Sequence, residues 1–117
     1  MRIALAQQNY HIGNFESNTK KIISAIEQAK KEGAELVVFS ELCVCGYPPR
    51  DFLEFDDFVN QCYASIDAIQ QHTEDIGVII GAPQKNLDAS GKELFNAAWL
   101  LYNREVLGVA QKTLLPT

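Results

Sequence analysis

Short apolar runs alternate with a stretch of helical spacing along the first third of the chain. Residues 2–8 and 36–39 are short and rich in apolar side chains, which is typical of strands inside a sheet. The second run is unbroken, so we predict a central strand that is covered on both faces. Between the two runs, Ile22 and Ile26 recur at helical spacing after Asn14, the predicted N-cap. This order predicts two parallel strands joined by a helix.

The remainder of the chain adds one helical pattern and three strand patterns. A helix is predicted at about residues 56–73 and a short buried strand at 77–83. Two longer strands, at 94–102 and 105–112, are predicted to form a hairpin around the turn at 103–104. The whole order, β-α-β-α-β-β-β, indicates an α/β layered sheet that is parallel at first and closed by an antiparallel pair.

Composition adds limits on location and partners. With 117 residues, of which 47% are apolar, the chain is long enough for one domain with a core. A net charge of -5 without a basic stripe argues against a nucleic-acid partner. No apolar stretch reaches the length of a signal-peptide core or a membrane span, so we expect a cytoplasmic protein without a membrane partner. An odd number of cysteines, three, fits a reducing compartment, and the spacing of Cys43 and Cys45 is not that of a common zinc pair, so no metal site is predicted.

Two charged residues at predicted strand ends are candidates for chemistry. Glu41 lies two residues after the strand at 36–39, and ligands of open α/β sheets gather beyond the carboxyl ends of strands. Lys112 ends a later strand. Alternation predicts that it shares one face with three residues, two of them small: Val106, Gly108 and Ala110. Taken alone, an acid after a strand is more often a loop or cap residue, and a lysine at a strand end more often reaches into water. The residues by themselves leave both alternatives open.

Three motifs carry a resemblance to a known superfamily. They are Glu-Leu-Val-Val-Phe-Ser-Glu at 35–41, Gly-Tyr at 46–47 and Lys-Thr-Leu-Leu-Pro at 112–116. The chain resembles the nitrilase, or carbon-nitrogen hydrolase, superfamily over most of its length. This resemblance implies a nitrilase-like α-β-β-α sandwich, of which residues 1–117 form about the first half of one domain.

The resemblance also implies a catalytic triad of glutamate, lysine and cysteine. Glu41 matches the glutamate and Lys112 matches the lysine. In the family the cysteine follows the lysine at some distance, whereas the three cysteines of this chain precede it, so we interpret them as small buried apolar residues. The nucleophile is therefore expected beyond this chain, and the 117 residues alone are expected to be inactive.

Within the superfamily, residues 46–53 (Gly-Tyr-Pro-Pro-Arg-Asp-Phe-Leu) most resemble the glutaminase domains of glutamine-dependent NAD synthetases. By this resemblance Tyr47 helps to line a glutamine pocket; the alternative is a ring that only packs the loop. Glu41 is then the general base and later acid, Lys112 orients the triad and stabilises the oxyanion, and the cysteine forms a γ-glutamyl thioester. No cofactor is implied for the glutaminase itself. The resemblance implies that the ammonia passes to a C-terminal synthetase domain that uses ATP and Mg and is absent from this chain. Half of such a domain leaves sheet edges and helix faces bare, so we also expect a homo-oligomer.

Two other functions remain open. One is a stand-alone nitrilase-family amidase or carbamoylase, which uses the same two residues on a different amide. The other is a non-catalytic, truncated interaction module. The coding sequence after Thr117 distinguishes them, because a synthetase domain with a phosphate-binding loop supports the glutaminase and an early stop supports an alternative.

Overall fold

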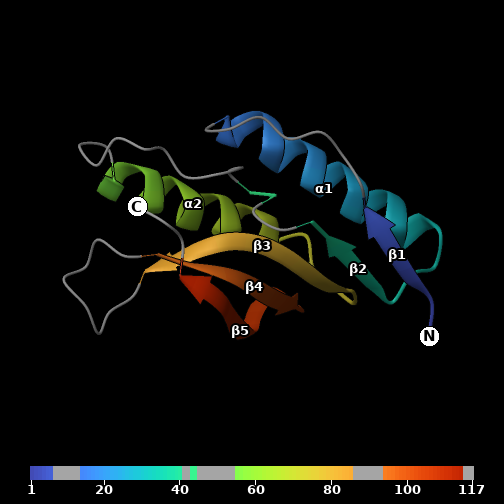
Figure 1. Ribbon diagram of the computed structural model, residues 1–117. Coiled ribbons are helices and arrows are strands. Elements are labelled where there is room, and N and C mark those ends of the chain that lie inside the picture. Colours follow the sequence, from blue (N-terminus) through green and yellow to red (C-terminus); the bar gives the residue numbers. More distant parts are fainter. Residues whose placement is uncertain (7–13, 41–42, 45–54, 86–93, 115–117) are drawn as a thin grey trace.

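Seven elements make up the described part of the molecule (Figure 1). The computed structural model describes residues 1–6, 14–40, 43–44, 55–85 and 94–114, with only the backbone for 55, 56, 94 and 112–114. In chain order the elements are β1 (Ile3–Ala6), α1 (Phe15–Lys31), β2 (Leu36–Phe39), α2 (Phe55–Gln70), β3 (Gly77–Lys85), β4 (Leu94–Tyr102) and β5 (Glu105–Leu114).

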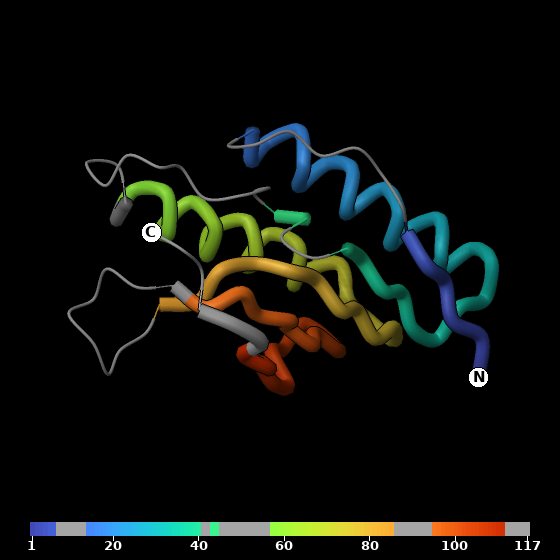
Figure 2. Tube along the Cα trace, viewed as in Figure 1, coloured from blue at the N-terminus to red at the C-terminus, as the bar shows by residue number. Residues whose placement is uncertain are grey.

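The strands form one sheet in the order β1-β2-β3-β4-β5. The first three are parallel, whereas β4 is antiparallel to both β3 and β5, which confirms the predicted topology. Figure 2 traces the sheet from β1 in blue at one edge to β5 in red at the other. Because β4 reverses the direction twice, β2, β3 and β5 run the same way. Their carboxyl ends therefore lie along the same side of the sheet, at right angles to the edge strands β1 and β5. We call this side the carboxyl edge of the sheet.

Helix α1 has the boundaries that its sequence predicts. The side chain of Asn14 accepts a hydrogen bond from the backbone N–H of Ser17 at 3.1 Å, which caps the amino end. Lys30 and Lys31 lie in the last turn, where a positive charge favours the helix dipole. Gly33 follows with a φ of 77°, a left-handed conformation that glycine adopts without a steric penalty.

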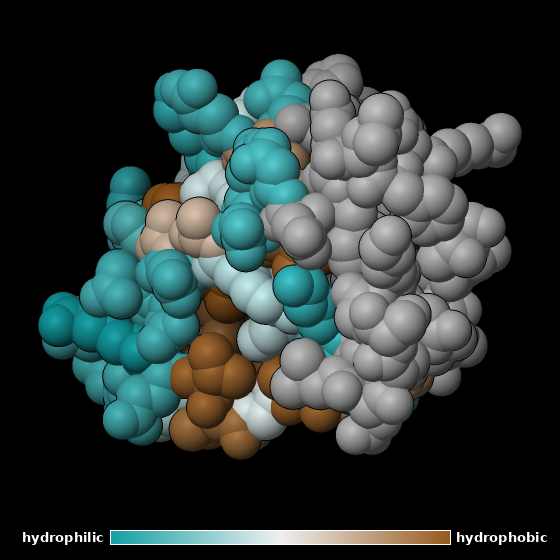
Figure 3. Space-filling view, turned by 90° about the vertical axis from the view of Figure 1, so that its left-hand side faces the viewer, coloured by the Kyte–Doolittle hydropathy of each residue, from teal (hydrophilic) through white to brown (hydrophobic). Residues whose placement is uncertain are grey.

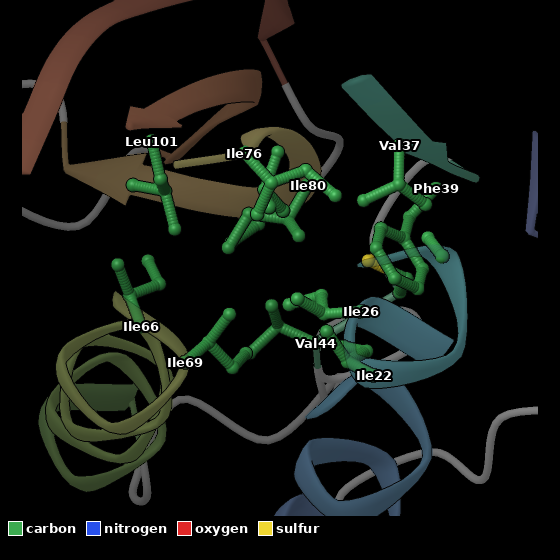
Figure 4. Close-up of a cluster of buried hydrophobic side chains, with 14 of the residues drawn as sticks. Ile22, Ile26, Val37, Phe39, Val44, Ile66, Ile69, Ile76, Ile80 and Leu101 are labelled. Carbon is green, nitrogen blue, oxygen red and sulfur yellow. The ribbon is translucent and has the colours of Figure 1, made fainter. Parts of the chain in front are cut away.

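The core lies between the sheet and the two helices, which both cover the same face (Figures 1 and 4). Figure 4 shows buried side chains from both layers facing one another: Ile22 and Ile26 of α1, Ile66 and Ile69 of α2, and Val37, Ile80 and Leu101 of the sheet. These apolar side chains leave water on folding, and that burial is the main force that holds the helices on the sheet.

Strand β2 is covered on only one face among the described residues. Val37 and Phe39 point toward the helices and are 1% and 6% exposed, whereas Leu36 and Val38 are only partly buried. The prediction of cover on both faces is therefore wrong for the part of the chain that the structure describes. The physical reason is that α1 and α2 lie on the same side of the sheet, so alternate residues of β2 meet no second layer.

The face of the sheet opposite the helices is apolar and open. Leu5 is 75% exposed and Leu107 is 56% exposed. A hollow of about 380 Å³ on this side is lined in part by Leu36, Leu100 and Leu107. Figure 3 shows apolar side chains at the surface in its lower part, away from the helices. Exposed apolar areas of this kind mark a surface that another element or protein covers.

Three elements end at residues other than those predicted, and one of them is β5, which continues past residue 112 to Leu114. Helix α2 stops at Gln70 instead of residue 73, because the hydroxyl of Thr73 donates to the Gln70 carbonyl at 2.8 Å and closes the last turn. Strand β3 continues past residue 83 to Lys85, whose backbone N–H donates to the hydroxyl of Tyr63 at 3.0 Å. The end of α2 thus depends on a side-chain hydrogen bond within its last turn, and the end of β3 on a residue 22 positions away.

Candidate active site

The structure describes little of the three predicted site residues themselves. Glu41 and Tyr47 lie outside the described residues. Lys112 belongs to β5, and only its backbone is described. The catalytic pairing of Glu41 with Lys112 and the pocket role of Tyr47 therefore stay predictions. The structure nevertheless describes residues on either side of Glu41, and the strand that carries Lys112.

The chain that follows β2 returns at once to β3. Pairing of β2 with β3 runs as far as Val38 opposite Ile79. Beyond this point, the N–H of Val44 donates to the carbonyl of Gly81 at 3.2 Å. The N–H of Gly81 donates to Sγ of Cys43 at 3.4 Å, and Sγ lies 3.7 Å from the Gly81 carbonyl oxygen. Residues 43 and 44 thus satisfy backbone groups of β3 that β2 no longer reaches.

Segment 43–44 is also held from the helix side. The side-chain amide of Asn18, on α1, donates to the carbonyl of Val44 at 3.3 Å. Val44 is fully buried, and Figure 4 shows its side chain beside Ile22, Ile26 and Ile69. The backbone of residues 43 and 44 is consequently held by both β3 and α1.

Lys112 lies at an irregularity of β5. Gln111 is opposite Ala97 and Thr113 is opposite Asn96, so Lys112 is the extra residue between two consecutive pairs. Such a β-bulge interrupts the alternation of side chains, turns the strand locally and is often found next to active sites.

A second bulge interrupts the row of small residues that the sequence predicts on β5. Val106 is opposite Leu101, which is buried on the helix side, whereas Gly108 is opposite Leu100, which is exposed. Val106 therefore does not lie in one continuous row with Gly108, and that prediction is wrong. The physical reason is the extra residue, Leu107, which shifts the register by one.

The topology nevertheless brings the carboxyl end of β2, two residues before Glu41 in the sequence, and the bulge of β5 to the same end of the sheet. Glu41 follows the carboxyl end of β2, and Lys112 is near the carboxyl end of β5. Three strand spacings separate β2 from β5, roughly 14 Å between backbones. A row of small residues crosses the intervening strands on the face without helices: Gly81, Ala98 and Ala110.

One carboxylate away from this edge has a perturbed pKa. Glu27 on α1 is 3.4 Å from Nδ1 of His72 and 3.4 Å from Nζ of Lys30. Partial desolvation acts to raise the pKa of Glu27, but the hydrogen bond with His72 and the positive charge of Lys30 together lower this pKa below its usual value. Glu27 is therefore a charged residue of the helix layer rather than a proton donor.

Within the ranges that the structure describes, no three side chains of His, Cys, Asp or Glu gather as ligands for a metal ion. No helix in the same ranges is long and apolar enough to cross a membrane.

Sequence reasoning assigned no role to several residues at this edge. Asn18 and Cys43 are 0% and 1% exposed and hold segment 43–44, and Asn96 is buried beside the bulge at Lys112. A signal existed for Asn18, because it precedes Ile22 by four residues and so lies on the apolar face of α1. No local signal exists for Cys43, because its partner on β3 is 38 residues away.

The fold and the sequence together place this protein in one class of enzymes. The chain belongs to the carbon-nitrogen hydrolase family, whose model matches residues 2–117. This confirms the superfamily that the motifs indicate.

Particular relatives narrow the class. The glutamine-dependent NAD(+) synthetase of Thermotoga maritima is 36% identical over 116 residues, which are 99% of this chain and 20% of that protein. The solved glutamine-dependent NAD+ synthetase of Acinetobacter baumannii has a TM-score of 0.75 at 36% identity, over 97% of this chain and 21% of that one. This chain therefore spans about a fifth of the length of these synthetases.

A smaller enzyme shares the fold as well. An amidase from Nesterenkonia sp. AN1 has a TM-score of 0.76 at 26% identity, over 96% of this chain and 44% of that one. In that structure a glutamate is replaced by glutamine, and acrylamide has added to the active site cysteine.

Proposed function

We propose that this chain supplies the glutamate and the lysine of a Glu-Lys-Cys triad that hydrolyses the side-chain amide of glutamine. The observation that carries the proposal is the topology, in which the segment after β2 and the bulge of β5 reach the same edge of the sheet. Membership of the carbon-nitrogen hydrolase family supports the reaction class. The names of relatives that are 36% identical support glutamine as the substrate.

The mechanism follows from what amide hydrolysis by a thiol requires. Glu41 takes the proton of the cysteine thiol, and the thiolate attacks the amide carbon. The ammonium group of Lys112 stabilises the oxyanion of the tetrahedral intermediate and favours the charged form of Glu41. Glu41 then gives its proton to the departing ammonia, which leaves a γ-glutamyl thioester. Water hydrolyses the thioester with Glu41 again as the base, and Tyr47 helps to line the glutamine pocket.

The cysteine and the second layer of the domain belong to residues beyond these 117. We assign residues 1–117 to the first part of one carbon-nitrogen hydrolase domain. The open apolar face supports this, because Leu5, Leu100 and Leu107 need a covering layer. The 44% share of the Nesterenkonia amidase that this chain matches is consistent with about half of such a domain.

In the complete enzyme, the released ammonia passes to a synthetase domain that uses ATP and Mg to make NAD. The glutaminase itself needs no cofactor. The names of the synthetase relatives, together with their fivefold greater length, support this arrangement. A homo-oligomer and a cytoplasmic location complete the proposal. A stand-alone amidase is the second candidate, favoured by the match to the Nesterenkonia enzyme but at lower identity.

Trapping of the acyl-enzyme in the full-length protein tests these roles. We expect Glu41→Gln and Lys112→Ala to abolish the mass increase that a γ-glutamyl thioester gives on incubation with glutamine. Glu35→Gln and Lys31→Ala are matched controls, because both side chains are exposed and neither lies at the carboxyl edge of the sheet. Undiminished trapping in either site variant refutes its role. Trapping with other amides but not with glutamine supports the stand-alone amidase instead.

A further inference from the structure

We propose that Asn18 and Cys43 are positioning residues for the catalytic glutamate, acting through segment 43–44. This inference rests on the proposed function, because it concerns the base assigned to Glu41. The four residues that carry it are Asn18 on α1, Cys43 and Val44 after β2, and Gly81 on β3. We call them the 43–44 anchor.

The anchor has a role because β3 extends beyond the end of β2, its parallel neighbour. Among the described residues, pairing of β2 with β3 ends at Val38 and Ile79, so the N–H and carbonyl of Gly81 lie beyond the paired part of β2. Buried backbone groups of this kind lose free energy unless they find partners. Cys43 and Val44 provide them, with the Gly81 N–H at 3.4 Å from Sγ and the Gly81 carbonyl at 3.2 Å from the Val44 N–H.

Asn18 adds a constraint that an apolar residue would not. Its side chain is 0% exposed, and a buried amide is costly unless it is hydrogen-bonded. A leucine of similar size would fill this position in the core. The amide instead donates to the Val44 carbonyl at 3.3 Å. Val44 is thereby held by its N–H, its carbonyl and its buried side chain.

The consequence for chemistry is that Glu41 lies in the sequence between two residues that the sheet holds, Phe39 and Cys43. Strand β2 ends at Phe39, two residues before Glu41, and Cys43 follows two residues after it. Because consecutive Cα atoms are about 3.8 Å apart, these anchors limit where the backbone of residue 41 can lie. A displacement of about 1 Å at a reacting group can cost roughly 100-fold in rate. Loss of the anchor is therefore expected to lower kcat rather than substrate binding.

Steady-state hydrolysis of glutamine by the full-length protein tests the inference. In Asn18→Leu and Cys43→Ala we expect kcat to fall by roughly 100-fold while KM changes by less than about threefold. Cys43→Ser keeps a donor and an acceptor near Gly81, so we expect it to recover most of the kcat that Cys43→Ala loses.

Two matched controls separate positioning from general destabilisation. Cys62→Ala removes a cysteine that is equally buried but lies on α2, and Thr73→Val removes a buried hydroxyl with two hydrogen bonds at the opposite edge of the sheet. Both are expected to keep kcat within about twofold even where the melting temperature falls. The inference is overturned if a control with the same melting temperature as Asn18→Leu or Cys43→Ala loses as much kcat as that variant does. Full activity in Asn18→Leu overturns it as well.

Failure of this inference is distinguishable from failure of the proposed function. If Glu41→Gln is inactive but Asn18→Leu and Cys43→Ala are unimpaired, the anchor has no positioning role and the triad assignment stands. If Glu41→Gln keeps its activity, both proposals fall. Should Asn18→Leu not fold, the comparison of Cys43→Ala with Cys43→Ser decides alone, and equal kcat values in that pair overturn the inference.

Discussion

Replacing Thr73 with valine removes a hydroxyl that joins the end of α2 to the turn between β4 and β5. That hydroxyl donates to the Gln70 carbonyl at 2.8 Å and accepts from the N–H of Arg104 at 2.8 Å. Asn103 and Arg104 have φ angles of 50° and 67°, as in a two-residue type I′ turn, and the left-handed conformation is unfavourable for a side chain such as arginine. The hydrogen bonds of Thr73 help to hold this turn.

The magnitude follows from the bonds lost. Valine keeps nearly the same volume in this fully buried position, so cavity formation contributes little. Two hydrogen bonds at a net of about 1 kcal/mol each give a loss of roughly 2 kcal/mol. In terms of the local opening equilibrium, that loss is a factor of about 30, since each 1.4 kcal/mol is tenfold.

Amide hydrogen exchange at Arg104 in the full-length protein measures the local opening equilibrium of the turn. It does not require the assumption that a large protein unfolds in one step. We expect exchange of the Arg104 amide to be about 30-fold faster in Thr73→Val. Thr73→Ser keeps the hydroxyl and loses only a methyl group, so most of the protection should remain. Equal acceleration in the serine and valine variants would refute the hydroxyl as the cause.

Two further predictions concern the surface. Because the folded pKa of Glu27 is lowered, its charged form stabilises the fold above the pKa of the unfolded chain, and this contribution is lost as pH falls through the lowered folded value. Glu27→Gln should therefore cost about 0.5 kcal/mol or less at neutral pH, since the side chain is 47% exposed, and the difference in urea denaturation between the two proteins should disappear once the pH falls below the lowered pKa of Glu27. The second prediction concerns the open face of the sheet. The 117-residue chain on its own should bind a hydrophobic dye, measured by fluorescence, and should self-associate, measured by light scattering. The double variant Leu5→Lys, Leu107→Glu should reduce both dye binding and self-association. Unchanged dye binding in that double variant would contradict an exposed apolar face.

Local patterns account for the elements that the sequence predicts well. The cap at Asn14, the stop at Gly33 and the turn at 103–104 each depend on residues within a few positions of one another. The Thr73 hydroxyl closes the last turn of α2 on the Gln70 carbonyl, and it also accepts from the N–H of Arg104, which is 31 residues away. The end of α2 was harder to predict because the second of these contacts is not visible in the local sequence.

The candidate site was predictable only in part. A glutamate after a strand and a lysine near the end of another are visible in the sequence, and motif resemblance links them. The bulge at Lys112 and the contacts of Cys43 with Gly81 are not visible, because the register between strands and the backbone groups left by a shorter neighbour are decided by pairing across the sheet.

The order of strands and helices, the parallel start of the sheet and the superfamily are all readable from the amino-acid sequence. They follow from apolar periodicity, capping residues and short motifs, all of which act over a few residues. Three features emerge only when the layers assemble: both helices lie on one face, Val106 leaves the row of small residues, and Asn18 and Gly81 hold residues 43–44. The physical reason is that burial and hydrogen-bond satisfaction are properties of the assembled layers, in which residues distant along the chain become neighbours.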